Sequence, residues 1–250
     1  MENQRYFLQI SYKGTNYHGW QSQNNAIAIQ DIINDVLSKK LSENINITGA
    51  GRTDTGVHAS YYIAHFDSVS MNLDKEDDLI NSLNSFLPED ISIHKITKVN
   101  NDFHSRYDAV SRTYKYFITR IKDPFCSETA LYHYGPLDIN KMNKCCEILI
   151  KYDDFESFCK LHSDNDTFIC KIKDTKWIEE DAKFIFTITA DRFLRNMVRS
   201  IVGTMLDVGK GKTSIEKFIE IIESKDRSKA GFSAPAHGLF LTGIQYHKII

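Results

Sequence analysis

The segment from Gly49 to Ala59 contains the residues of this chain best suited to chemistry. It reads Gly-Ala-Gly-Arg-Thr-Asp-Thr-Gly-Val-His-Ala, so that Arg52 stands two residues before the carboxylate of Asp54. Glycine permits positive φ and close approach of the backbone to a ligand, which favours a tight loop that presents these two side chains. A nearby cation keeps a carboxylate ionised, as a nucleophile or a general base must be. A plain turn between two strands would show the same glycines.

Two common phosphate-binding loops do not fit this segment. A dinucleotide fingerprint requires glycine where this chain has Asp54, and a P-loop ends in Gly-Lys-Ser/Thr. The sequence also lacks the Gly-x-Ser-x-Gly elbow of serine hydrolases and the His-Glu-x-x-His of zinc proteases. The segment therefore offers a reactive carboxylate and no phosphate cradle.

The glycine-rich segment resembles the catalytic loop of the TruA family of tRNA pseudouridine synthases. Other segments resemble this family in the same order along the chain: Tyr17-His18-Gly19-Trp20-Gln21-x-Gln23, Phe103-His104-Ser105-Arg106, Arg112-Thr113-Tyr114-x-Tyr116, Asn196-Met197-Val198-Arg199-x-Ile201-Val202-Gly203 and Ala234-Pro235-x-x-Gly238-Leu239. The resemblance implies an isomerase that acts on tRNA in its anticodon stem-loop, with base flipping. It also implies a homodimer that works without a cofactor or a metal.

Pseudouridine formation breaks the C1′–N1 bond of uridine, turns the detached uracil, and joins its C5 atom to C1′. The reaction needs a carboxylate, a surface that holds the free base and a pocket for a flipped nucleotide. An aromatic ring can hold the base, because stacking is worth about 1–3 kcal/mol per base.

The resemblance implies catalytic roles for three residues. Asp54 is the expected nucleophile or base, whether it attacks C6, attacks C1′ or acts through a glycal. Tyr114 is the expected platform for the uracil, while Tyr116 is expected to be structural. Arg199 is the expected ion-pair partner of the catalytic carboxylate, a role that suits the planar guanidinium.

The resemblance also implies residues that bind the substrate. Arg52 is expected either to fill the space left by the flipped base or to contact a phosphate. The other candidates for tRNA binding are His18, Gln21, Arg106 and Arg112.

The elements that must position these residues form two similar series. In the first, alternation and helical periodicity predict strands at 6–12, 45–48, 60–66 and 91–96, and helices around 29–37 and 79–87. In the second they predict strands through 114–118, 168–177, 183–190 and 239–246, with helices around 139–149, at 193–208 and after residue 213. Asp138 is the expected N-cap of the helix at 139–149, and Thr213 with Glu216 fits a capping box.

This order predicts an α+β fold of two ferredoxin-like, split β-α-β halves related by a pseudo-twofold axis. The sheet should be largely antiparallel with helices on one face, and the catalytic cleft is expected between the halves. Residues 1–104 would form the half with the aspartate loop. Residues 105–250 would form the half with the tyrosine platform and the arginine helix.

On a helix at 193–208, the side chains of Arg192, Arg195 and Arg199 would lie within about 60° of one another. They would form one basic ridge opposite the apolar face. An amphipathic helix with a solvated face would show the same pattern.

The composition limits how the chain can bind nucleic acid. Hydrophobic residues make up 42% and charged residues 26%, as in ordinary globular proteins, and the net charge is -2. A general nucleic-acid binder is usually basic, so any RNA contact must be a local patch. Candidates besides the site residues are Lys115, Arg120, Arg192, Arg195 and the run Lys225 to Lys229.

The cysteines and the N-terminus indicate the compartment. Five cysteines without a C-x-x-C pair suggest neither a disulfide framework nor a zinc site. The first residues show no basic region followed by an apolar stretch of signal-peptide length, and no apolar run reaches membrane-spanning length. We expect a cytoplasmic protein with reduced thiols and no membrane partner.

One alternative of another class remains open, a non-catalytic module built from duplicated RNA-recognition units. Asp54 distinguishes the enzyme from this module, because a carboxylate that faces phosphates would repel RNA and lower the affinity of a protein that only binds.

Overall fold

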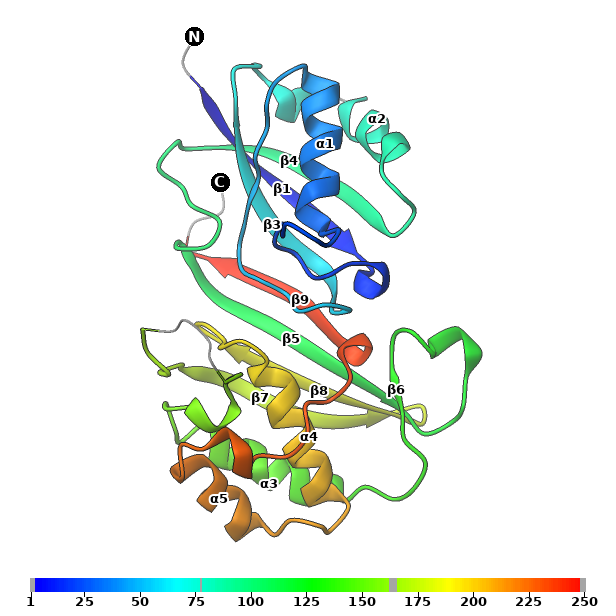
Figure 1. Ribbon diagram of the computed structural model, residues 1–250, viewed down its shortest axis with the longest axis vertical. Coiled ribbons are helices and arrows are strands. Elements are labelled where there is room, and N and C mark those ends of the chain that lie inside the picture. Colours follow the sequence, from blue (N-terminus) through cyan, green and yellow to red (C-terminus); the bar gives the residue numbers. More distant parts are fainter. Residues whose placement is uncertain (1–2, 77, 162–165, 248–250) are drawn as a thin grey trace. The chain divides into compact units, whose positions relative to one another are not determined.

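The structure is a computed structural model of the 250-residue chain and describes residues 3–76, 78–161 and 166–247 (Figure 1). The chain divides into two compact units. Unit 1 contains Met1–Val110 and Leu241–Ile250, and unit 2 contains Ser111–Phe240. Both units combine strands with helices, which confirms the predicted α+β class.

Unit 1 follows the predicted order of elements. It contains β1 (Gln4–Tyr12), α1 (Ile29–Leu41), β2 (Thr48–Gly49), β3 (His58–Ser68), α2 (Leu79–Phe86), β4 (Ile91–Val99) and most of β9 (Leu239–Tyr246). Strand β1 lies between β3 and β4 and is antiparallel to both. Strand β9 extends this sheet beyond β3.

The core of unit 1 follows from the sequence periodicity. Alternate residues of β1, beginning with Tyr6 and Leu8, are buried. The apolar stripe of α1, which includes Ile29 and Ile33, is buried as well. Helices α1 and α2 contact each other, and α2 packs against β4 (Figure 1). A strand of period 2 and a helix of period 3.6 each bury one face, and these faces form a common core.

Unit 2 likewise combines strands with helices. It contains most of β5 (Ala109–Thr119), followed by β6 (Leu131–Tyr132), α3 (Ile139–Leu149), β7 (Ile172–Glu180), β8 (Lys183–Ala190), α4 (Met197–Gly209) and α5 (Ile215–Glu223). Strand β8 lies between β5 and β7 and is antiparallel to both. The short β6, which the periodicity did not predict, pairs parallel with the end of β5. The predicted, largely antiparallel sheet is confirmed, while the pseudo-twofold relation of ferredoxin-like halves stays a prediction.

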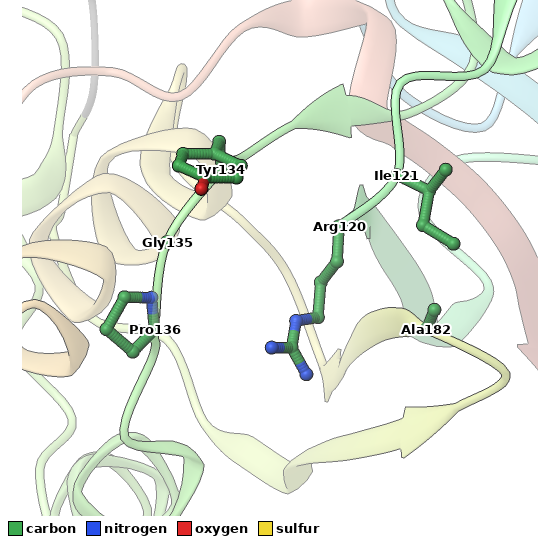
Figure 2. A pocket seen from close by; sticks show the side chains of 6 residues that line it. All are labelled: Arg120, Ile121, Tyr134, Gly135, Pro136 and Ala182. Carbon is green, nitrogen blue, oxygen red and sulfur yellow. The ribbon is translucent and has the colours of Figure 1, made fainter.

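A shallow hollow lies at the far end of β5 (Figure 2). Its lining residues are Arg120, Ile121, Tyr134, Gly135, Pro136 and Ala182. The Arg120 guanidinium pairs with Glu179 at 3.1 Å and lies over the ring of Phe184. Arg120 is six residues from Tyr114, about 20 Å along an extended chain. The hollow is therefore distant from the expected uracil platform within unit 2.

Two helix starts test the expected caps. The Asp138 carboxylate accepts the backbone N–H of Lys141 at 3.0 Å, which confirms it as the N-cap of α3. The predicted cap at Thr213 is wrong by one residue. Ser214 has the extended N-cap backbone, and its hydroxyl accepts the N–H of Lys217 at 3.1 Å.

The predicted strand at 45–48 is mostly absent as a strand, since β2 contains only Thr48 and Gly49. The Ile45 N–H donates to the Ser38 hydroxyl at 2.9 Å, and the Ile47 N–H donates to the Asn34 side chain at 2.8 Å. The backbone here is thus bonded by polar side chains of α1 instead of a neighbouring strand.

The predicted basic ridge of three arginines does not form. Helix α4 begins only at Met197, because Asn196 before it has φ 66°. Asparagine tolerates this left-handed conformation, which ends a regular right-handed helix. Arg192 and Arg195 therefore precede the helix, and only Arg199 lies in its first turn.

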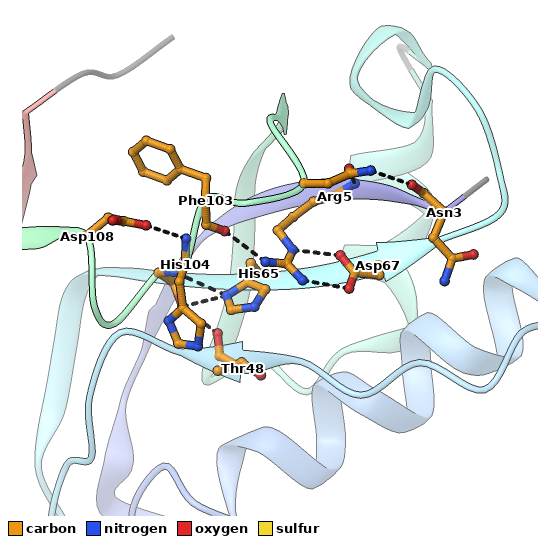
Figure 3. A network of polar contacts seen from close by, with 10 residues as sticks. Asn3, Arg5, Thr48, His65, Asp67, Phe103, His104 and Asp108 are labelled. Atoms are coloured by element: carbon orange, nitrogen blue, oxygen red, sulfur yellow. Dashed lines mark hydrogen bonds and ion pairs between the residues drawn. The ribbon is translucent and has the colours of Figure 1, made fainter.

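A polar network in unit 1 joins β1 and β3 to the turn at 103–108 (Figure 3). The Arg5 guanidinium forms a two-bond ion pair with Asp67, at 2.7 and 2.8 Å, and donates to the Phe103 carbonyl. The buried His65 accepts the Ser105 backbone N–H at its Nδ1 atom, 3.2 Å away. The Ser105 hydroxyl donates to the Thr48 carbonyl at 2.8 Å. The Ser105 hydroxyl also lies 2.8 Å from this Nδ1 atom, so the backbone and the side chain of one residue both hold the His65 ring.

This network should make unfolding pH-dependent. Burial, with smaller contributions from the charge of Arg5 and from His104, lowers the pKa of His65 to about 4, against an ordinary value of 6.5. The unfolded chain takes up a proton near pH 6.5 and the folded protein only near pH 4, so stability falls as the pH drops through this window. After allowance for solvent screening, we expect the free energy of unfolding to fall by about 1–2 kcal/mol across this window.

Urea unfolding above and below the window measures this loss. The matched control is His65→Asn, whose side chain keeps a hydrogen-bond acceptor and does not titrate. Carboxylates other than the neighbouring Asp67 contribute equally in both proteins, so the difference between their pH profiles reports His65 and its coupling to Asp67. Parallel profiles would refute the prediction.

Candidate functional site

The glycine-rich segment connects β2 to β3, as the sequence predicts. Ala50 follows β2, and its N–H donates to the Ile63 carbonyl of β3 at 2.9 Å. The Val57 N–H donates to the Asp54 carbonyl at 3.1 Å and closes a turn, in which Gly56 has φ 77°. The Asp54 side chain is partly exposed at this turn.

The three glycines of the loop are present for different reasons. A Cβ atom on Gly49 would lie 2.1 Å from the Tyr62 hydroxyl and 2.4 Å from the Trp20 indole nitrogen, so a side chain cannot fit. Gly56 is needed for its positive φ. Beside Gly51, no atom of the described residues other than its two chain neighbours lies within 4 Å of the Cβ position, so the space there is open.

Aromatic residues pack beneath the glycine-rich loop and hydrogen-bond to it. The Trp20 and Tyr62 rings stack with centroids 4.0 Å apart, and Tyr12 packs against both. The Tyr62 hydroxyl donates to the Gly51 carbonyl. The Tyr12 and Thr53 hydroxyls are 2.8 Å apart. Packed aromatic rings are rigid, and they hold the backbone on the N-terminal side of Asp54.

The segment from Tyr17 to Gln21 lies against the same loop. The Trp20 N–H donates to the Thr53 carbonyl at 3.3 Å, and the Gly56 N–H donates to the Tyr17 carbonyl at 3.3 Å. Gly19, at φ 87°, approaches Thr53 so closely that a Cβ atom would lie 2.3 Å from its carbonyl oxygen. These bonds hold the backbone on both sides of Asp54.

Of the predicted site residues in unit 1, Arg52 and Gln21 are in direct contact. The Arg52 Nε atom donates to the Gln21 side-chain carbonyl at 3.2 Å, and both side chains are exposed. His18 is exposed in the same segment, and its carbonyl accepts the Gln23 amide at 2.9 Å. Asp54, Arg52, Gln21 and His18 thus belong to two segments that are hydrogen-bonded together.

Arg106 lies elsewhere in unit 1, in the turn that precedes β5. Its guanidinium is 5.5 Å from the centre of the Tyr107 ring, and this ring is 75% exposed. An exposed cation beside an exposed aromatic ring offers a nucleic acid both charge and a stacking surface.

Tyr114 and Tyr116 lie on one face of β5, yet their surroundings differ. The partly exposed Tyr114 ring contacts Phe193 edge to face at 5.2 Å. Tyr116 is fully buried, its hydroxyl donates to the Pro235 carbonyl at 2.9 Å, and its ring lies against Gly238. A base cannot stack on a ring that is covered on both faces, so Tyr114 is the better candidate platform.

The remaining candidates of unit 2 are arginines held by backbone carbonyls. Arg112 donates from Nη1 to the Asp191 carbonyl at 2.8 Å. Arg199 donates from Nε to the Ala234 carbonyl at 2.7 Å, and its own carbonyl accepts the Ala234 N–H at 2.9 Å. Burial raises the pKa of Tyr116, and the charge of Arg199 opposes this shift.

The sequence patterns did not indicate which residues support the site. Tyr12 and Tyr62 looked like ordinary strand residues. Trp20, Thr53 and Ala234 stand in the quoted motifs, but nothing in those motifs indicated their contacts with Tyr62, Tyr12 and Arg199. Such contacts join residues far apart in sequence, which local periodicity does not record.

In the part of the chain that the structure describes, no three His, Cys, Asp or Glu side chains gather as metal ligands would. Nor do residues 3–76, 78–161 and 166–247 contain a helix with the length and apolar character to cross a bilayer.

Comparisons with known proteins place the chain in a family. Residues 9–108 and 151–247 match the family described as tRNA pseudouridine synthase. Asp54 and Arg199 lie inside the matched ranges, while Arg112 and Tyr114 lie between them.

Similar proteins extend over the full length of the chain. A tRNA pseudouridine synthase A from Bacteroides fragilis is 50% identical over 98% of this chain and 98% of its own. The protein of the same name from Bacteroides thetaiotaomicron is 48% identical, over 97% and 91%. The one from Francisella tularensis subsp. holarctica is 39% identical, over 96% and 93%. The chain therefore belongs to the tRNA pseudouridine synthase family of enzymes, as the sequence motifs predicted.

Proposed function

We propose that this protein converts uridine to pseudouridine in the anticodon stem-loop of tRNA, with Asp54 as the catalytic carboxylate. The observation that carries the proposal is the Asp54 loop itself. The backbone on both sides of Asp54 is fixed by packed aromatic rings and by hydrogen bonds from the 17–21 segment, while the side chain is partly exposed. A rigid backbone with an accessible reactive group is what a positioned nucleophile or base requires.

Each further residue has a distinct role in this proposal. The Tyr114 ring would hold the detached uracil while it turns, because it is the accessible tyrosine of β5. Arg199 would supply the positive charge that keeps the reacting carboxylate ionised. Arg52, next to Gln21 and beside the open space at Gly51, would occupy the position vacated by the flipped base or bind a phosphate.

A few local contacts would provide the affinity for tRNA. The net charge of -2 excludes a generally basic surface, so His18, Gln21, Arg106 and Arg112 would act with the loop. If phosphates carry most of this binding, the affinity should fall steeply with salt. We also propose, from the resemblance to the family, that the protein works in the cytoplasm as a homodimer.

The isomerisation itself provides the test. Joining C5 to C1′ releases the C5 hydrogen to water, so the purified protein should release tritium from tRNA labelled at C5 of uridine. Mapping of pseudouridine in the product should place it in the anticodon stem-loop. Binding of tRNA without any tritium release would favour the non-catalytic alternative, and modification of another arm would refute the proposed site.

A further inference from the structure

The segment from Ala230 to Pro235, here called the strap, runs along α4 in the opposite direction. The Gly231 N–H donates to the Thr204 hydroxyl at 2.9 Å, and the Ala234 N–H donates to the Arg199 carbonyl at 2.9 Å. Between these points the contact is so close that a Cβ atom on Gly203 would lie 1.8 Å from the Phe232 carbonyl oxygen. The strap is therefore seated directly on the helix backbone.

The strap also holds the side chain of Arg199. The Ala234 carbonyl accepts the Nε hydrogen of Arg199 at 2.7 Å. A guanidinium is planar, so a bond at Nε fixes the direction of the two terminal nitrogens. Any shift of the strap would thus turn the group that we propose to serve the catalytic carboxylate.

Arg227 clamps the strap through hydrogen bonds to three of its residues. Its Nη1 atom donates to the Gly231 carbonyl at 3.1 Å and to the Ala230 carbonyl at 3.4 Å. Its Nη2 atom donates to the Ser233 hydroxyl at 3.0 Å, which also accepts the Asn196 amide at 2.7 Å. One guanidinium thereby joins the start and the middle of the strap.

The surroundings of Arg227 argue against a role in binding RNA. It belongs to the basic run Lys225 to Lys229, which by sequence alone is a candidate phosphate site. Its side chain is partly buried, the acceptors named above are all neutral, and burial lowers its pKa. Desolvation costs a cation energy, and the fork-shaped group regains it by holding the strap at several points.

We propose that Arg227 is a positioning residue for Arg199, acting through the strap. The inference rests on the proposed function, since it assigns Arg199 a part in the reaction. It adds a residue that touches neither substrate nor reacting atoms and that no sequence motif indicated.

The experiment compares Arg227→Lys and Arg227→Gln in single-turnover tritium release and in tRNA binding. Neither substitute can bond Ala230, Gly231 and Ser233 together, so both should slow turnover by about tenfold to a hundredfold. The dissociation constant of tRNA and its salt dependence should stay as in the wild type. Ser233→Ala, a smaller change in the same clamp, should slow turnover in the same direction. Lys217→Gln, which removes an exposed charge on α5, is the matched control.

A double-mutant cycle separates positioning from a general structural effect. If Arg227 acts through Arg199, Arg227→Lys should have little further effect in the Arg199→Lys background. A loss of the same factor in both backgrounds would overturn the proposal, as would an Arg199→Lys protein with the wild-type rate. A contact between Arg227 and a phosphate of tRNA would give a different pattern. Arg227→Lys would then keep the wild-type turnover and tRNA affinity, whereas Arg227→Gln would bind tRNA more weakly and with a smaller salt dependence.

A spectroscopic readout makes the inference independent of turnover. The Arg199 Nε hydrogen should exchange slowly with water in the wild type, because it is bonded to Ala234. It should exchange faster in Arg227→Lys, as nitrogen-resolved NMR can measure on protein whose melting temperature is also recorded. Faster exchange in a protein that never releases tritium would sink the proposed function and leave the clamp standing. If the Arg199 Nε hydrogen exchanges at the wild-type rate in Arg227→Lys, the clamp is overturned, even if the wild-type protein releases tritium as proposed.

Discussion

Replacing Asp54 by asparagine should abolish tritium release from C5-labelled uridine in tRNA, while tRNA binding stays within about tenfold of the wild type. Asparagine has nearly the same shape as aspartate but can neither attack carbon nor accept a proton at neutral pH. The loop should keep its conformation, because the bonds that hold it are made by the backbone of Thr53, Asp54 and Gly56. The loss should therefore appear in turnover and not in binding.

Thr55→Ala is the matched control for this prediction. Thr55 is the exposed neighbour of Asp54, and the reaction has no use for its hydroxyl. Its removal should leave both turnover and binding unchanged. Retained turnover in Asp54→Asn would rule out the carboxylate as nucleophile or base, and a large loss of binding would indicate a role in recognition instead.

Replacing Tyr114 by alanine should slow turnover by about 5-fold to 150-fold, the equivalent of one lost base stack of about 1–3 kcal/mol. Tyr114→Phe should retain most of the activity, because the ring and its contact with Phe193 remain. The free energy of unfolding should change little in either protein, since the Tyr114 side chain is only partly buried.

Tyr116→Ala should lose activity for another reason, because the substitution destabilises the folded protein. Its ring is 0% exposed, and removal of a buried aromatic ring lowers the free energy of unfolding by about 3–5 kcal/mol. Tyr134→Ala controls for the loss of an exposed tyrosine, since this ring in unit 2 is 85% exposed and lines the hollow beyond the end of β5. Turnover and urea unfolding should be measured on all four proteins. Equal turnover losses at constant stability in Tyr114→Ala and Tyr116→Ala would refute the platform.

Strong local patterns predicted most of the elements. The bounds of α3, β8 and β9 agree with the sequence expectation, and those of β1, α1 and β3 differ from it by a few residues at their ends. Each of these segments buries one face at a regular period, and that period is a property of the local sequence.

The wrong predictions share one physical cause. Helix α4 begins after Asn196 because this residue adopts a left-handed conformation, and the asparagine bonds Ser233 far along the chain. Residues Ile45 and Ile47 leave the sheet because the side chains of Ser38 and Asn34 take their N–H groups. In each case a specific polar contact outweighed a propensity worth less than about 1 kcal/mol per residue.

The sequence by itself determined the family and predicted the loop between β2 and β3, and it singled out Asp54 as the candidate reactive carboxylate, because residue types at fixed spacing carry that information. Only the tertiary structure showed why Gly49 and Gly51 differ, why Tyr116 is inaccessible where Tyr114 is not, and that Arg227 clamps the strap instead of extending a basic surface. These facts depend on atoms brought together from distant parts of the chain. Spacing along the sequence can indicate a candidate reactive group, but the residues that hold this group in place are brought to it only when the chain folds.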